Sequence, residues 1–200
     1  MSFDAAKIRK EFPFFDNNPN LIYFDNAATT QKPSCVLNAF NDYYSTYNSN
    51  VHRGLYPWAE KATSTYESAR NKVAKYINTN SQNIIFTSGA TEANTLAFKL
   101  SHKPSVIMSA IEHPSVLNQS KGADMIKVLK NGIICLKDLE KILQKQKDVD
   151  KLVSIMAVNN ETGIIQPLKE VSSLCSKYGA LLHVDAVQAL GRIPINMTKL

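Results

Sequence analysis

The feature that most restricts how this chain can fold is the alternation of strand-like and helix-like segments after residue 83. Apolar and β-branched runs predict strands at residues 84–87, 105–109, 124–129, 152–158 and 181–184. Helical spacing of apolar residues predicts helices between them, at 91–100, within 115–121, at 136–146 and at 168–178. This order predicts parallel strands joined by right-handed crossovers, and therefore an α/β fold.

The part of the chain before residue 84 has a different pattern. The sequence predicts a short helix over residues 4–12, ended by Pro13, and a short strand over residues 21–24. Aromatic and apolar residues recur at helical spacing over 36–47, and a second long helix should follow Pro57 and end near residue 78. We expect residues 1–20 to form an N-terminal arm and residues 21–200 to belong to one larger domain.

Composition narrows the function only a little. The net charge is +6, but the lysines are scattered, so we interpret them as solvated faces rather than a nucleic-acid surface. The three cysteines lie far apart without metal-ligand or disulfide spacing, which favours a reduced, cytoplasmic setting. No apolar run approaches the roughly 20 residues of a membrane span. We therefore expect neither a membrane nor a nucleic-acid partner, and no metal site.

A short apolar run, Leu-Leu-His-Val, delivers Asp185 to the end of the last predicted strand, and Gln188 follows three residues later. A carboxylate buried at a sheet edge is costly unless a cation meets it. Asp185 could instead cap the next helix or form a structural ion pair. Taken alone, this stretch leaves both interpretations open.

The stretch Thr-Ser-Gly-Ala-Thr-Glu-Ala-Asn, residues 87–94, joins a predicted strand to a predicted helix through a glycine and small residues. Free amides and the positive dipole end of a helix suit a phosphate, and the hydroxyls of Ser88 and Thr91 could add donors. The alternative is an ordinary capped turn, in which Thr91 and Asn94 only start the helix.

Two other predicted strands are followed by polar side chains. His113 precedes Pro114, which keeps the preceding residue extended, and the pair follows strand 105–109. Asn160 lies in an Asn-Asn-Glu-Thr-Gly turn after strand 152–158 and can donate without titrating. Ligands of open α/β sheets bind at the carboxyl ends of the strands. The sequence thus predicts a phosphate cradle, a flat aromatic ring, an amide and a carboxylate along one edge.

These residues resemble a known family, the cysteine desulfurases of the class V aminotransferase group, which are pyridoxal-phosphate enzymes of fold type I. The resemblance extends from Tyr23 to the last residue and rests on the motifs TSGATEAN, EHPSV, NNETGIIQP and HVDAVQALGR. The early stretches YFDNAATTQKP and NVHRG resemble the Suf branch, whereas the later motifs resemble the Isc and Nif branch. The subgroup stays open between the two.

The resemblance implies a three-layer α/β sandwich with a mostly parallel sheet, forming an incomplete large domain with an N-terminal helical arm. It also implies pyridoxal 5′-phosphate as cofactor, L-cysteine as substrate, a sulfur-acceptor or scaffold protein of iron–sulfur assembly as partner, and a homodimer. His113 is implied to stack on the pyridine ring and assist proton transfer. The implied cofactor-binding residues are Ala90, Thr91, His113, Asn160, Asp185 and Gln188, and the implied substrate-side residues are Asn26, His52 and Arg53.

Other parts of the family pattern have no counterpart in this sequence. The family carries its cofactor on a lysine in a Ser-x-His-Lys stretch, and it uses a nucleophilic cysteine on a mobile loop, a substrate-binding arginine and a C-terminal small domain. We therefore expect residues 1–200 to be the N-terminal portion of a longer enzyme and to be catalytically incomplete. The alternatives are a short non-catalytic paralogue that binds a cofactor or partner, and a fragment of a selenocysteine lyase, kynureninase or aminotransferase.

Overall fold

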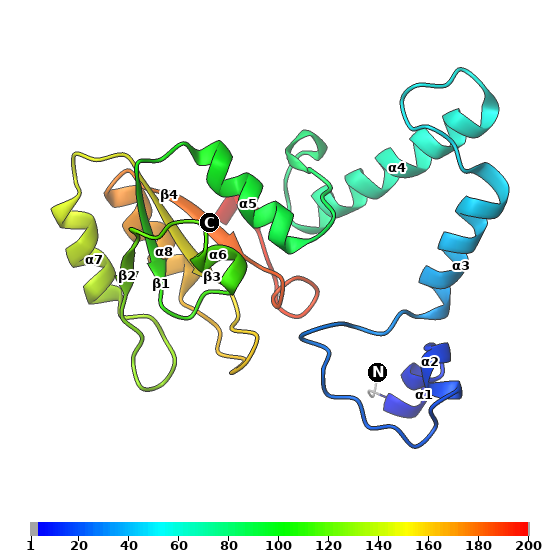
Figure 1. Cartoon of the computed structure of the whole chain (residues 1–200), viewed down its shortest axis with the longest axis horizontal. Helices are drawn as coiled ribbons and strands as arrows, with labels where there is room; N and C mark the ends of the chain where they lie inside the picture. The colour runs from blue at the N-terminus through cyan, green and yellow to red at the C-terminus, as the bar shows by residue number, and fades with distance from the viewer. Residues whose placement is uncertain (1–3, 200) are drawn as a thin grey trace. The chain divides into compact units, whose positions relative to one another are not determined.

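A computed structural model describes residues 4–199 of the chain (Figure 1). The chain divides into two compact units, Met1–Lys75 and Tyr76–Leu200, and each is described by itself. The expected boundary after residue 20 stays a prediction. Among the described residues, no helix combines the length and the apolar composition needed to cross a membrane.

The first unit is helical. Its elements are α1 (Ala5–Arg9), α2 (Pro13–Asp16), α3 (Ser34–Asp42), the π-helical turn η1 (Tyr43–Tyr47) and α4 (Pro57–Tyr76), which continues one residue into the second unit. The helix predicted over 4–12 ends earlier, at Arg9, and Pro13 begins a new helix instead of only ending the first. Proline suits this first helical position because its missing amide would have no intrahelical partner there.

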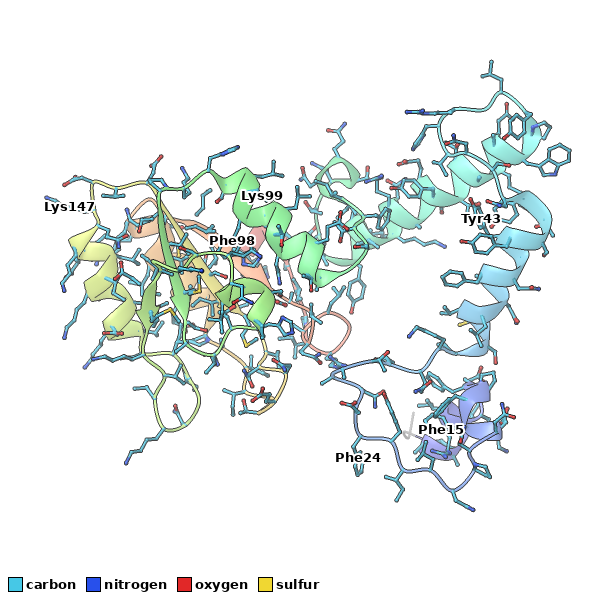
Figure 2. All side chains as sticks on the ribbon, viewed as in Figure 1. Phe15, Phe24, Tyr43, Phe98, Lys99 and Lys147 are labelled. Atoms are coloured by element: carbon cyan, nitrogen blue, oxygen red, sulfur yellow. The ribbon has the colours of Figure 1, made fainter. Side chains whose placement is uncertain are left out.

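The strand predicted at residues 21–24 is wrong. These residues have no regular secondary structure and pair with no strand among the described residues, and an unpaired segment is not a stable strand. Ile22 and Phe24 are 76% and 93% exposed, and Figure 2 shows Phe24 projecting from the ribbon. The apolar pattern of this segment was therefore a poor guide to sheet pairing within the described chain.

The second unit contains a four-stranded parallel sheet in the order β2-β1-β3-β4. Its strands are β1 (Ser105–Ser109), β2 (Asp124–Ile126), β3 (Lys151–Met156) and β4 (Leu181–Asp185). Its helices are α5 (Ala90–Ser101), α6 (Pro114–Leu117), α7 (Leu136–Lys145) and α8 (Leu168–Lys177), with 3-10 turns η2 (Ser81–Asn83) and η3 (Met197–Lys199). The parallel α/β arrangement predicted from the alternation is confirmed.

Helices cover both faces of this sheet, which gives the three layers predicted. On one face, α7 and α8 pack on a core in which Leu182 of β4 takes part, together with Ile107, Ile126, Ile134, Leu139, Leu143, Val153, Ile155, Val171 and Cys175. Side chains alternate between faces along a strand, so His183 lies on the other face. There its ring meets Phe98 of α5, with ring centroids 5.3 Å apart (Figure 2).

Two of the predicted strands need correction. Residues 84–87 belong to no strand of the described sheet, and Ile85 and Phe86 are 65% and 42% exposed. The strand predicted over 124–129 ends at Ile126, because the chain then turns back and Val128 forms an isolated antiparallel bridge with Ile134. The C-terminal glycine of α8 was predicted correctly: Gly179 has φ of +63°, a conformation that glycine adopts without strain.

Candidate functional site

The loops after β1, β3 and β4 carry the polar residues singled out in the sequence. His113, Asn160 and Asp185 follow or end three adjacent parallel strands, so all three lie at the same edge of the sheet. The loops are also joined directly. The Ala157 amide donates to the Asp185 carbonyl at 2.8 Å, and the Asn159 side-chain amide donates to the Ile111 carbonyl at 3.2 Å.

Asp185 ends β4 and is only 8% exposed. Its Oδ1 accepts from the Val187 amide at 3.1 Å, and its Oδ2 accepts from Asn94 Nδ2 at 3.0 Å. These two hydrogen bonds satisfy both oxygens of the carboxyl group, which the apolar strand alone would leave buried without partners. Nearby, burial lowers the pKa of His183, and the charge of Asp185 opposes that shift.

The contact to Asn94 belongs to a longer chain of hydrogen bonds. Asn94 lies buried on α5, and its Nδ2 also donates to Ser115 Oγ at 2.9 Å. Ser115 Oγ lies 2.8 Å from His113 Nδ1, and the Ser115 amide donates to the same ring nitrogen at 3.1 Å. The amide bond makes His113 the side-chain N-cap of α6. Asp185 and His113 are therefore linked through two intervening side chains.

The start of α5 is the segment predicted to bind a phosphate. Ala90 and Thr91 begin the helix, and both are exposed. The first amides of a helix have no intrahelical acceptor. Next to them, both the amide and the hydroxyl of Ser88 donate to Glu92 Oε2, at 2.7 and 2.6 Å, and these bonds lower the Glu92 pKa. The donors of Ser88 are thus already used within the loop.

A buried carboxyl lies beside this edge. Glu112 is 4% exposed, and its Oε1 accepts from the Met156 amide at 2.8 Å and from the Ser109 hydroxyl. Its Oε2 is buried without a hydrogen-bond partner in the described part of the chain. Burial raises the Glu112 pKa to about 7, the charge of Asp185 adds to that rise, and the two hydrogen bonds oppose it. The site therefore contains two buried carboxyls, Asp185 with donors to both of its oxygens and Glu112 with an oxygen that has no partner among the described residues.

In the tandem asparagines after β3, the first residue organises the turn. Asn159 is buried, and its Oδ1 accepts from the amides of Glu161 and Thr162 and from the Thr162 hydroxyl. Asn160 is exposed at the turn itself. This division leaves Asn160 as the one of the pair whose side chain faces solvent rather than the loop backbone.

Gln188 lies on the turn after β4, where its Oε1 and backbone carbonyl accept from Arg192. It is half-buried and stays within three residues of Asp185. The six predicted cofactor-side positions, Ala90, Thr91, His113, Asn160, Asp185 and Gln188, all belong to the second compact unit.

The substrate-side residues predicted from the resemblance lie in the first unit. His52 has a positive φ of 64°, and its Nε2 lies 3.1 Å from Glu67 Oε1 on α4. Arg53 is exposed beside it. Asn26 is also exposed, and its backbone carbonyl accepts from the Thr30 hydroxyl at 3.3 Å. Within this unit, His52 is held by α4 and the other two side chains face solvent.

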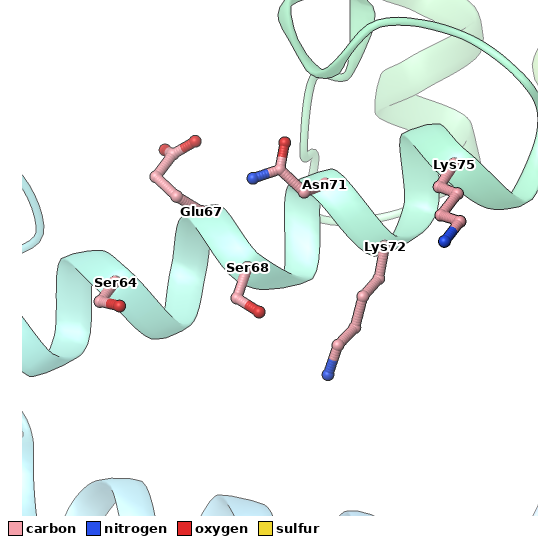
Figure 3. A pocket seen from close by; sticks show the side chains of 6 residues that line it. All are labelled: Ser64, Glu67, Ser68, Asn71, Lys72 and Lys75. Atoms are coloured by element: carbon pink, nitrogen blue, oxygen red, sulfur yellow. The ribbon is translucent and has the colours of Figure 1, made fainter.

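The first unit also has a hollow along α4, shown in Figure 3. It is lined by Ser64, Glu67, Ser68, Asn71, Lys72 and Lys75, which all come from the same helix. A hollow with one helix as its wall does not converge polar groups on a ligand, so we assign it no function.

The cysteines do not form a reactive centre in the described residues. Cys175 is buried on the inner side of α8, and burial raises its thiol pKa to about 11, which keeps it a thiol at neutral pH. Cys35 lies exposed on α3, and Cys135 is partly exposed before α7.

Three residues of this site were missed from the sequence. Asn94 was interpreted only as a possible capping partner, while Ser115 and Glu112 were quoted within a motif without a role. Asn94 and Ser115 connect two elements 21 residues apart in sequence, which no local pattern indicates. For Glu112 the available signal was its position, three residues after the end of the strand at Ser109. A carboxyl group so close to a buried strand end could have been predicted to be buried.

Comparison with known proteins defines the class of this chain. Residues 22–200 match the family described as aminotransferase class-V. The chain therefore belongs to this family. Class V aminotransferases, including the cysteine desulfurases, depend on pyridoxal phosphate.

Within that class, the relatives are cysteine desulfurases. A probable cysteine desulfurase of Halalkalibacterium halodurans is 35% identical over 98% of this chain and 52% of its own length. The cysteine desulfurase IscS of Rickettsia felis is 38% identical over 92% of this chain and 47% of its own length. The chain thus spans about half the length of the curated relatives it matches.

Solved structures agree with this assignment and with the predicted fold. The apo cysteine desulfurase of Thermococcus onnurineus superimposes with a TM-score of 0.85 and 31% identity, covering 100% of this chain and 52% of that one. A NifS-like protein of Rickettsia africae gives a TM-score of 0.80 and 31% identity, covering 90% and 51%. The fold therefore matches that of fold type I pyridoxal-phosphate enzymes, over about half of each solved chain.

Proposed function

We propose that residues 76–200 carry one wall of a pyridoxal-phosphate pocket in a cysteine desulfurase. The observation that carries this proposal is the buried Asp185 carboxylate, held by Asn94 and the Val187 amide at the strand edge. In this arrangement two hydrogen bonds fix the carboxyl group, as is required of an acceptor for a protonated ring nitrogen.

The donors at this edge fit the chemical groups of the cofactor. The first turn of α5, at Ala90 and Thr91, offers amides to a phosphate, and the flat exposed ring of His113 offers a stacking surface. Asn160 and Gln188 supply amide groups for neutral polar atoms of the ligand. An extra Cβ on Gly89 would meet nothing within 4 Å, so the approach to the α5 amides is open within this unit.

In the whole protein, we propose that these residues serve the conversion of L-cysteine to L-alanine, with the sulfur passed to an enzyme cysteine. When bound, pyridoxal phosphate supplies the electron sink for this chemistry. Asp185 keeps a positive charge on the ring nitrogen, the α5 turn fixes the phosphate, and His113 holds a proton near the substrate. Asn26, His52 and Arg53 are proposed to contact the substrate.

The proposal extends to the partner and the cellular setting. We propose that the sulfur is delivered to an acceptor or scaffold protein of iron–sulfur assembly, in the cytoplasm, by a homodimer. Support comes from the similarity to a protein named cysteine desulfurase IscS, at 38% identity over 92% of this chain.

Removal of the Asp185 carboxylate should weaken cofactor binding. Pyridoxamine 5′-phosphate is the suitable probe, because it lacks the aldehyde that would react with surface lysines. In calorimetric titration of the 1–200 chain, we expect Asp185→Ala to bind about tenfold more weakly or worse, the loss expected for a hydrogen bond to a charged group. Asp148→Ala, at an exposed aspartate after α7, should bind like the parent chain. Equal affinity of Asp185→Ala and the parent would refute the proposed pocket.

The 1–200 chain alone should not release alanine from L-cysteine when supplied with pyridoxal phosphate. The reason is that no Ser-x-His-Lys stretch occurs among its residues, so no lysine matches the cofactor-bearing position of the family. Amino-acid analysis of the reaction mixture measures this directly. Alanine above the level of a protein-free mixture would show that one of the lysines present replaces the family lysine.

A further inference from the structure

We propose that Asn94 and Ser115 are positioning residues that hold His113 in one tautomer, with the ring proton on Nε2. The inference deepens the proposed function, since it assigns a state to the residue expected to stack on the cofactor. It rests on four side chains of the second unit, which run Asp185, Asn94, Ser115 and His113 in an unbroken series of hydrogen bonds.

Chemistry fixes the direction of the first two bonds. The Asn94 side chain turns its NH2 group, which can only donate, toward Asp185 Oδ2, 3.0 Å away. The second hydrogen of the same NH2 group then points to Ser115 Oγ at 2.9 Å. Ser115 Oγ is therefore an acceptor from Asn94 and keeps its own hydrogen for another partner.

The same reasoning fixes the last bond. The Ser115 hydroxyl, 2.8 Å from His113 Nδ1, has its hydrogen left to donate, and the Ser115 backbone amide donates to the same nitrogen at 3.1 Å. A backbone amide cannot accept, so a proton on Nδ1 would face the Ser115 N–H and would also leave the hydroxyl hydrogen without this acceptor. Nδ1 is therefore the unprotonated nitrogen of the neutral ring, and Nε2 carries the hydrogen.

This assignment has a consequence for the proposed chemistry. Nδ1 is occupied by α6, so the ring nitrogen that remains for a ligand is Nε2, and it presents a donor. His113 would then meet substrate or cofactor as a hydrogen-bond donor whose orientation depends on Asp185. Capping of α6 by itself requires only the bond from the Ser115 backbone amide to Nδ1. The Ser115 hydroxyl is a second donor to Nδ1, and the buried Asn94 side chain connects this hydroxyl to the Asp185 carboxyl group.

Nitrogen-15 NMR of the histidine rings tests the inference without any cofactor. The chain has four histidines, so His113→Gln identifies the His113 signals by their loss. In the parent chain at neutral pH we expect the pattern of an Nε2–H ring. In Ser115→Ala, the Nε2–H to Nδ1–H ratio should fall about fivefold, the factor that one net hydrogen bond supplies. Asn94→Ala should move the ratio in the same direction.

Gln119→Ala is the matched control. Gln119 Nε2 donates to the Ser115 carbonyl at 2.7 Å and to Thr95 Oγ1 at 2.9 Å, so it joins the same two helices without entering the series. We expect it to leave the His113 pattern unchanged. A proton on Nδ1 in the parent chain would overturn the inference, and this measurement does not depend on whether the variants fold. A ratio in Ser115→Ala equal to that of the parent chain would also overturn it. Pyridoxamine phosphate affinity is measured separately, so the pocket and the tautomer can fail independently.

Discussion

Replacement of Glu112 by glutamine should stabilise the second unit relative to the parent chain at pH 8. At pH 5 the gain over the parent chain should be much smaller. Burial raises the Glu112 pKa to about 7 in the folded protein, from an ordinary value of 4.5. Each pKa unit corresponds to about 1.4 kcal/mol, so ionisation of Glu112 costs the folded state about 3 kcal/mol once the pH exceeds the folded pKa. Glutamine keeps an oxygen to accept from the Met156 amide and the Ser109 hydroxyl, but it cannot ionise.

The sign of this pH dependence follows from proton linkage. Between pH 4.5 and 7 the folded state binds more protons at Glu112 than the unfolded state, so the stability of the parent chain falls as the pH rises. Glu112→Gln should remove that slope. Urea unfolding at pH 5, 6, 7 and 8 measures it, with Glu170→Gln on the exposed side of α8 as the control. Parallel pH profiles of Glu112→Gln and the parent would show that Glu112 ionises normally.

Local sequence pattern predicted the second unit well because its elements are internally determined. The helix predicted over 136–146 is α7, Leu136–Lys145, because its apolar residues form one stripe. The strand predicted at 105–109 coincides with β1, since it is buried and bounded by turn residues. Alternation of strands and helices is compatible with few topologies, so the parallel sheet could be predicted from it.

The failures share a physical cause, which is that pairing and burial are not local. Residues 84–87 and 21–24 have strand composition, yet they are outside the described sheet and expose Ile22, Phe24 and Ile85. Strand propensity records how a side chain fits a pleated surface, and it cannot supply the neighbouring strand. The motifs placed His113 and Asp185 at one edge correctly. They could not reveal that Asn94 and Ser115 join them, because that link depends on where α5 and α6 lie over the sheet.

The same contrast between local pattern and burial makes Leu139→Ala a demanding test of the core. Leu139 is fully buried on α7, in the cluster that includes Leu143, Val153 and Val171. Truncation removes apolar contacts and leaves a cavity, so we expect a loss of about 3 kcal/mol in the free energy of unfolding. Lys141→Ala, exposed on the same helix, should change it by less than about 0.5 kcal/mol. Urea unfolding of both variants measures the contrast, and a small loss for Leu139→Ala would mean that α7 does not pack on the sheet as described.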